Sequence, residues 1–363
     1  MSWYIMRFRL SLIAIVLLCA SAARGQDAIV QNSEEEAPSW KDVVRTYEPI
    51  YVGYTFDEDD QAFMDFSLSV MTPASILLPW RSWNPQNKFP DRVGSYQRTA
   101  SKWQPRMYIA FSGRAGQYIG TRESSPVVGK RFNPLFSLRW WQEDTENRSP
   151  ENATGRELGL YDYFELSYGH ESNGQSIGDV EDPQTPEEMD LGRLRYEARR
   201  REAEIVDGDT DIARDDLSRG WDYIGARWAN SWKHDNHTWY LQLDGRYYLS
   251  DGLLQGEAEE YNLWENDGDW LARYDGEITR SKVDGLRATL RYRSQSLNRI
   301  LDANEASIEV RTGYEDPFER LTVKLELGFK YTSLWYRYGY NSDLVNYYHK
   351  DESWGIAIRI RQF

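Results

Sequence analysis

The chain has 363 residues, with 43 Lys and Arg against 58 Asp and Glu, giving a formal net charge of −15 at neutral pH. Such an excess of negative charge argues against nucleic acid as a partner, because phosphate binding needs clustered positive charge. Aromatic residues make up 14% of the chain, including 15 Trp and 25 Tyr. This content is expected when aromatic rings gather at the two interfaces of a membrane.

The first 25 residues have the pattern of a secretory signal peptide. Arg7 and Arg9 precede an apolar run over residues 10–20, and small residues follow it. The run is shorter than the roughly 20 apolar residues that a spanning helix needs, so we expect cleavage before Gln26 rather than a membrane anchor. The single cysteine, Cys19, falls inside this signal, so the mature chain would form no disulfide. Residues 26–60 are acidic and irregular, and we expect an exposed N-terminal extension there.

From residue 61 to the C-terminus, apolar and polar residues alternate in one segment after another. In a β-strand this alternation separates an apolar face from a polar one. The clearest segments are residues 64–70, 239–249, 270–279, 286–293 and 321–331. Their polar faces carry full charges, which the lumen of a barrel accommodates, and closure leaves no sheet edge in lipid. We therefore predict an all-β protein, a transmembrane antiparallel β-barrel of about 12 strands over residues 61–363 in a bacterial outer membrane.

A soluble β-sandwich with a charged exterior is the alternative that this alternation leaves open. The C-terminal strand favours the barrel, because a terminal Phe363 on an alternating strand resembles the end of bacterial outer-membrane proteins. Its apolar residues are expected to face outward, because an arginine that faces lipid at mid-membrane costs about 2–4 kcal/mol. These residues are Ile356, Ile358 and Ile360.

Residues 177–217 interrupt the alternation. They are dense in charge, with Pro183 and Pro186 near their start, and residues 187–205 have a helical composition. We expect a long inserted surface loop that contains one helix.

Two reactive side chains share one face of the strand predicted to end near residue 172. His170 and Ser172 have the same parity as the apolar residues Phe164 and Leu166. Asp222 lies on the apolar parity of the strand expected to pair with this one. Because an unpaired carboxylate facing lipid is costly, we expect a hydrogen bond from His170 to Asp222. The three residues then form a Ser-His-Asp triad. The alternative is that Asp222 merely sits in water at the interface.

The sequence His-x-Ser-Asn-Gly at residues 170–174, followed by Ser-Arg-x-Trp-Asp at 218–222, resembles outer-membrane phospholipase A. Glu-Ser-Ser-Pro at 123–126 and the segment 339–347 extend the resemblance, which covers about residues 64 to 363. It implies that Ser172 is the nucleophile, His170 the general base and Asp222 the third member, where the family commonly has Asn. It also implies that the backbone N–H of Gly174 belongs to the oxyanion hole.

The resemblance further implies a calcium ion and a calcium-dependent homodimer. The ligands would be the Ser218 hydroxyl, the Gln175 carbonyl and the Ser124 carbonyl of a second copy, all hard oxygens that suit Ca²⁺. Gln175 replaces an Arg of the family. The connection from Gln175 to Ser218 is about 40 residues here, whereas in the family it is a few.

These residues predict a lipid-facing carboxylic-ester hydrolase. The resemblance implies that it acts on membrane phospholipids, with phospholipase A1/A2 and lysophospholipase activity. A non-enzymatic channel or structural barrel is the main alternative, and an esterase directed at lipid A is a third. A channel has no use for a triad outside its lumen. However, the charged lumen residues fit a pore as well as a plugged interior; they are Arg287, Arg291, Lys324, Glu326 and Lys330.

Overall fold

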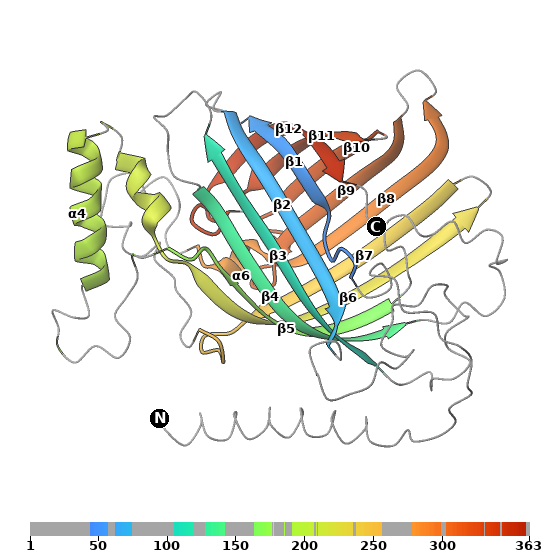
Figure 1. Cartoon of the computed structure of the whole chain (residues 1–363), viewed down its shortest axis with the longest axis horizontal. Helices are drawn as coiled ribbons and strands as arrows, with labels where there is room; N and C mark the ends of the chain where they lie inside the picture. The colour runs from blue at the N-terminus through green and yellow to red at the C-terminus, as the bar shows by residue number, and fades with distance from the viewer. Residues whose placement is uncertain are drawn as a thin grey trace. The chain divides into compact units, whose positions relative to one another are not determined.

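The computed structural model describes residues 44–56, 62–74, 105–118, 128–141, 163–175, 177, 185, 191–206, 208, 210–234, 237–255, 278–298, 303–329, 331–341 and 343–360. The twelve strands in these ranges form one closed barrel (Figure 1). Each strand pairs antiparallel with its neighbours in the sequence, and β1 closes the barrel against β12. The predicted fold class is confirmed.

The strands β1 to β12 are Ile50–Phe56, Ala62–Pro73, Arg106–Tyr118, Val128–Trp141, Tyr163–Ser172, Gly220–His234, His237–Tyr248, Gly285–Asn298, Ala303–Gly313, Thr322–Gly328, Thr332–Tyr340 and Lys350–Ile360. The helical elements are α4 (Leu191–Val206), the 3-10 helix η5 (Thr210–Asp216) and α6 (Arg280–Val283). None of the described helices is long and apolar enough to cross a membrane.

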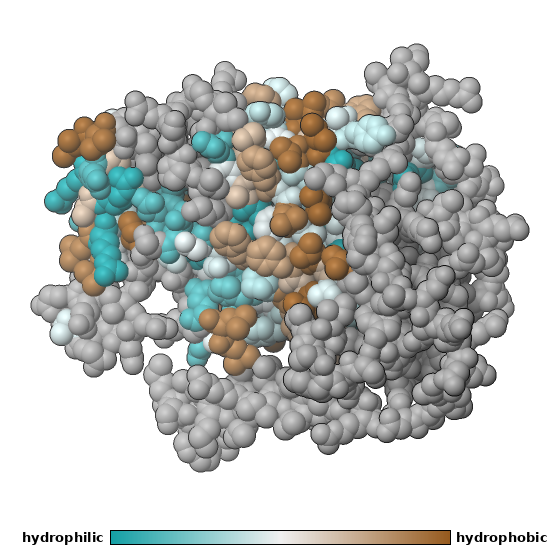
Figure 2. All heavy atoms as spheres, in the orientation of Figure 1, coloured by the Kyte–Doolittle hydropathy of each residue, from teal (hydrophilic) through white to brown (hydrophobic). Residues whose placement is uncertain are grey.

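The outside of the barrel is apolar along its strands, as the alternation predicts. Leu325 and Leu327 on β10 are exposed, whereas Glu326 between them lines the interior. Ile356 and Ile358 on β12 also lie on the outside. Figure 2 shows apolar side chains gathered over the strands that face the viewer. This distribution suits lipid outside and water inside, the reverse of a soluble β-sandwich.

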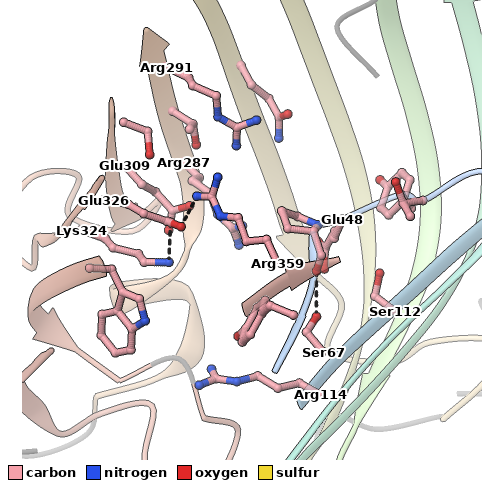
Figure 3. A pocket seen from close by; sticks show the side chains of 18 of the residues that line it. Glu48, Ser67, Ser112, Arg114, Arg287, Arg291, Glu309, Lys324, Glu326 and Arg359 are labelled. Atoms are coloured by element: carbon pink, nitrogen blue, oxygen red, sulfur yellow. Dashed lines mark hydrogen bonds and ion pairs between the residues drawn. The ribbon is translucent and has the colours of Figure 1, made fainter. Parts of the chain in front are cut away.

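The interior holds a charged cavity of about 320 Å³ (Figure 3). Arg287, Arg291, Lys324 and Glu326 line it, as predicted from the sequence. Lys330 lies outside the described residues. Glu326 on β10 accepts a hydrogen bond from Arg359 on β12 along the inner wall of the barrel, and it pairs with Lys324 at 3.1 Å. Opposite charges thus pair across strands within the lumen.

The barrel begins earlier in the chain than the sequence analysis predicts. Strand β1 starts at Ile50, inside the range assigned to an exposed extension, and the residues before it enter the lumen. The Tyr47 hydroxyl donates to Glu165 at 2.8 Å, and its ring lies 4.5 Å from the Arg227 guanidinium. These contacts and the pairing of β1 with β12 correct the boundary at residue 61. The predicted signal peptide, residues 1–25, lies outside the described residues.

The inserted segment 177–217 is joined at its base and packs against the β11–β12 connection. Ile177 and Leu217 form a β-bridge, in which the Ser218 N–H donates to the Ile177 carbonyl at 2.6 Å. Tyr196 of α4 and Ala213 of η5 belong to one buried cluster with Val345, from the β11–β12 connection. Helix α4 falls where a helix is predicted, although it starts at Leu191. The strand predicted over 270–279 lies outside the described residues except at its last two positions.

The two faces of β9 offer a matched test of the barrel's orientation. Ile308, at the middle of the strand, is 38% exposed on the outside, whereas its neighbour Ser307 lines the lumen cavity. We expect Ile308→Arg to lower the free energy of unfolding by about 2–4 kcal/mol, because the new charge faces hydrocarbon. Ser307→Arg should cost much less, since the new charge enters the polar lumen, between Glu326 on β10 and Arg291 on β8. Urea unfolding of the barrel in lipid vesicles measures both. Equal losses would contradict this assignment of the faces.

Candidate active site on the outer face of β5 and β6

Strands β5 and β6 bring His170 and Asp222 together. The register of the two strands sets His170 opposite Asp222 and Ser172 opposite Gly220. The His170 Nδ1 lies 2.7 Å from the Asp222 Oδ1. This contact leaves Nε2 as the ring nitrogen available for proton transfer. Ser172 lies at the next position on the same face of β5, so the three side chains gather at one end of the strand pair.

Asp222 is buried although its parity is that of the lipid-facing side. It is 2% exposed, whereas Ile224, two residues along the same face, is 46% exposed. Its carboxylate accepts three hydrogen bonds. One comes from His170 on Oδ1, and the other two reach Oδ2, from the Tyr168 hydroxyl at 2.5 Å and the Leu254 N–H at 2.7 Å. The charge is therefore satisfied by protein donors rather than by water.

The turn after β5 is held by Asn173. The Asn173 side chain donates to the Leu217 carbonyl at 2.6 Å and accepts from the Arg219 N–H at 2.9 Å. The Asn173 N–H also donates to the Arg219 carbonyl at 3.1 Å. We call these contacts of Asn173 with Leu217 and Arg219 the Asn173 junction. Gly174 follows with a φ of +64°, in the left-handed region that favours glycine. The Asn173 junction therefore joins the two ends of the insertion beside the candidate triad.

Two of the three candidate calcium ligands lie at the Asn173 junction. Gln175 lies on its first segment, where the Gln175 N–H reaches Asn173 Oδ1 at 3.4 Å, and Ser218 lies on its second, between the two residues that Asn173 binds. Ser124 lies outside the described residues. No group of three or more His, Cys, Asp or Glu side chains suited to a metal occurs in the described part of the chain. Any calcium there would be held by neutral hydroxyl and carbonyl oxygens.

The inner side of the same strand carries an ion network centred on Glu171. Its carboxylate is fully buried and accepts from Arg131 at 2.6 Å, from Arg246 at 3.0 Å and from Arg280 at 3.1 Å. These arginines come from β4, β7 and α6. Arg280 also pairs with Asp284 at 2.8 Å. Because Glu171 lies between His170 and Ser172 in the sequence, this network fixes the backbone of both from inside the barrel.

Aromatic side chains fill the barrel interior near this network. Trp221, which neighbours Asp222 but points inward, contacts the rings of Tyr248 and Tyr347. The Arg280 guanidinium lies 5.6 Å from the Trp221 ring. The other members of this buried cluster are Tyr223, Ile278, Val283, Leu344 and Tyr348. This end of the lumen is therefore packed with side chains.

Sequence reasoning missed several residues that support the site. Tyr168 shares the parity of His170, so its position on the outer face was readable, but its hydrogen bond to Asp222 was not. The contacts of Leu253 and Leu254 with the site come from a distant connection that carries no motif. A signal for Glu171 existed in its inward parity, which sets a carboxylate beside a lumen rich in arginine.

Glu171→Gln tests how far the inner network supports the outer site. We expect the free energy of unfolding to fall by about 3–5 kcal/mol, because three guanidinium groups, those of Arg246 and Arg280 buried, lose their shared carboxylate. The matched control is Glu319→Gln, whose carboxylate is 58% exposed beside Arg320 and should change stability by about 0–1 kcal/mol. Urea unfolding in vesicles measures both variants. An unchanged midpoint for Glu171→Gln would show that the network does not support the strand.

No family model and no curated protein matches this chain. Among solved structures, it is similar to an active-site mutant of outer membrane phospholipase A from Escherichia coli. The TM-score is 0.49 at 15% identity, covering 90% of this chain and 94% of that one. A further structure of the Escherichia coli protein gives a TM-score of 0.47 at 16% identity, with the same coverage. The calcium-bound phospholipase dimer of Salmonella typhi gives 0.45 at 16% identity, covering 87% and 92%. The likeness concerns the barrel fold alone.

Proposed function

We propose that this protein is a phospholipid acyl hydrolase of the outer membrane, with phospholipase A1/A2 and lysophospholipase activity. The observation that carries the proposal is the His170–Asp222 contact on the lipid-facing side of β5 and β6, one same-face position from Ser172. A hydrogen-bonded acid–base pair has no evident use on a surface that otherwise meets lipid, where polar groups are costly. The compounds that reach this surface are membrane lipids, whose ester bonds such a triad hydrolyses.

The reaction would follow the two-step course of serine hydrolases. The Ser172 Oγ attacks the ester carbonyl carbon while the His170 Nε2 accepts the hydroxyl proton. Asp222 holds the imidazole through Nδ1 and stabilises the imidazolium. The ester C–O bond then breaks, and the leaving alcohol takes the proton from His170. In the second step His170 deprotonates a water molecule, which attacks the acyl-enzyme carbonyl. The bond from the acyl group to the Ser172 Oγ then breaks, His170 returns the proton to that oxygen, and the fatty acid leaves.

The negative charge that develops on the carbonyl oxygen needs a donor beside Ser172. The Gly174 N–H is our candidate, as the family resemblance implies; Gly174 lies two residues after Ser172 and has a left-handed φ of +64°. Losing one such donor typically costs about 2.7–4 kcal/mol of transition-state stabilisation.

A calcium ion fits the oxygen chemistry at the Asn173 junction. The Ser218 hydroxyl and the Gln175 carbonyl would hold it, and when bound it would supply positive charge near the oxyanion. Calcium takes about 6–8 oxygen ligands, more than these two residues offer. The Ser124 carbonyl of a second copy and water would complete the set, so we propose a calcium-dependent homodimer as the active form.

The packed interior favours the enzyme over an open channel. Trp221 and Tyr248 fill the lumen near the site, and Tyr47 enters it from the N-terminal segment. We expect the purified protein in a planar bilayer to show no steady conductance of the size of an open pore. Such conductance, in protein that releases no fatty acid, would favour the channel instead.

Acyl release from dispersed phospholipid tests the hydrolase directly. We expect wild-type protein refolded in detergent to release fatty acid with calcium, and Ser172→Ala to lose all release above background because it lacks the nucleophile. The matched control is Ser167→Ala, which removes a hydroxyl from the opposite face of β5 and should stay active. Heat-modifiable migration on a gel verifies that each barrel is folded. A folded wild-type protein without activity would overturn the proposed function.

The metal assignment has its own test in the calcium titration of this activity. We expect a chelator to abolish release and Ser218→Ala to raise the calcium concentration needed for half-maximal release, because the hydroxyl ligand is lost. Gln175→Ala should leave that concentration nearly unchanged, since the carbonyl remains. Release that ignores the chelator would keep Ser172 as nucleophile and remove calcium from the mechanism.

A further inference from the structure

We propose that Tyr168 and the 251–255 segment, here called the cap, form a positioning device for Asp222. They hold Oδ2 of the carboxylate so that Oδ1 faces His170, and they make the site specific for an aspartate in place of an amide. The inference deepens the proposed function and rests on it, since it concerns the acid that orients the general base. Neither Tyr168 nor the cap touches the reacting ester in this scheme. Both act through Asp222.

The hydrogen bonds around Oδ2 have only one consistent direction. The Leu254 N–H donates to Oδ2 at 2.7 Å, and the Leu253 N–H donates to the Tyr168 hydroxyl oxygen, also at 2.7 Å. Because Leu253 fills an acceptor position of the phenol, the phenol proton is directed to Asp222. Oδ2 therefore meets two donors. An asparagine at this position has two orientations. In one its NH₂ group meets the two donors, and in the other its NH₂ group faces His170.

The close approach of the cap depends on Gly252. A Cβ built on Gly252 would lie 2.1 Å from the Asp222 Oδ2, so a side chain there would push the cap away. The same cap meets β6 at Gly220, where an added Cβ would lie 2.1 Å from the Gln255 Oε1. Before the cap, the Leu249 N–H donates to the Asp222 carbonyl at 2.8 Å. The approach at Gly252 is the tighter of the two, because the Gln255 side chain can move whereas the hydrogen-bonded Asp222 carboxylate is held.

The cap turns its polar and apolar sides in opposite directions. Its backbone N–H groups point at Asp222 and Tyr168, while the side chains of Leu253 and Leu254 are 40% and 64% exposed. Apolar side chains on the outer face are compatible with contact with lipid. Water is thereby kept from the carboxylate, and a hydrogen bond to a charge is stronger in such a low-dielectric setting.

Tyr168→Phe is the variant that tests the positioning role. We expect kcat for acyl release to fall roughly 10–100-fold, as for a lost hydrogen bond to a charged group, with KM nearly unchanged. The acid limb of kcat/KM should move to higher pH, because less of the carboxylate charge is taken up by donors and more acts on the imidazolium. The titratable groups that face Asp222 are His170 and Tyr168 on β5, with Asp251 of the cap near Tyr168. Tyr54→Phe, on the outer face of β1, is the control.

A double-mutant cycle distinguishes positioning from general support. Asp222→Asn should lower kcat here, and adding Tyr168→Phe to it should cost little more, because the phenol then has no charge to hold. Gly252→Ala should mimic Tyr168→Phe by displacing the cap. Equal losses from Tyr168→Phe in both backgrounds, with no shift of the pH profile, would overturn the proposal, as would wild-type kinetics in Tyr168→Phe.

A spectroscopic measurement separates this inference from the proposed function. In protein labelled with ¹⁵N-histidine, the His170–Asp222 proton should give a downfield ¹H resonance that moves in Tyr168→Phe and stays in Tyr54→Phe. This shift in a protein without acyl hydrolysis would sink the proposed function but keep the positioning device. Hydrolysis by wild type together with an unmoved resonance in Tyr168→Phe would keep the proposed function and overturn the positioning role.

Discussion

Every polar group that faces hydrocarbon must find its hydrogen-bond partner within the protein, and this constraint organises the whole molecule. The backbone meets it by closure, since the pairing of β1 with β12 leaves no open edge among the described strands. Asp222 meets it by a different route, with three donors from β5 and the 251–255 cap. The backbone of the barrel and the carboxylate of the candidate site thus both find their hydrogen-bond partners within the protein. A charged residue can stand on the outer face because its neighbours replace water completely.

The alternation of a strand lets β5 perform two tasks at once. Its outer positions hold His170 and Ser172, and the position between them holds Glu171, which faces inward to three arginines. A buried ion network of this kind adds little net stability compared with apolar packing, but the loss of one member is severe. Its value here is geometric. It fixes the strand from the inner side, where arginines compensate the buried charge, so the outer side can stay sparsely polar.

The sequence predicts what depends on alternation and leaves out what depends on contacts between distant residues. The barrel, the outward parity of His170 and Ser172 and the charged lumen all follow from side chains two apart. The contacts of Asn173 with Leu217, or of Leu254 with Asp222, join residues 44 and 32 positions apart, which no local pattern encodes. The sequence analysis missed strand β1, although the outward-facing Val52 and Tyr54 flank the buried Gly53. Acidic residues follow it at 57–60, so the whole stretch read as one extension.

The insertion at 177–217 packs against a connection that comes from the far side of the barrel. Its base is closed by the bridge between Ile177 and Leu217, and loop closure is inexpensive, since doubling the length of a loop costs only about 0.6 kcal/mol. From this base the insertion packs against Val345, in the connection between β11 and β12. Those strands lie half-way round the barrel from β5 and β6. The β11–β12 connection therefore spans the barrel mouth, since its residues Leu344 and Tyr347 also pack against Trp221 of β6.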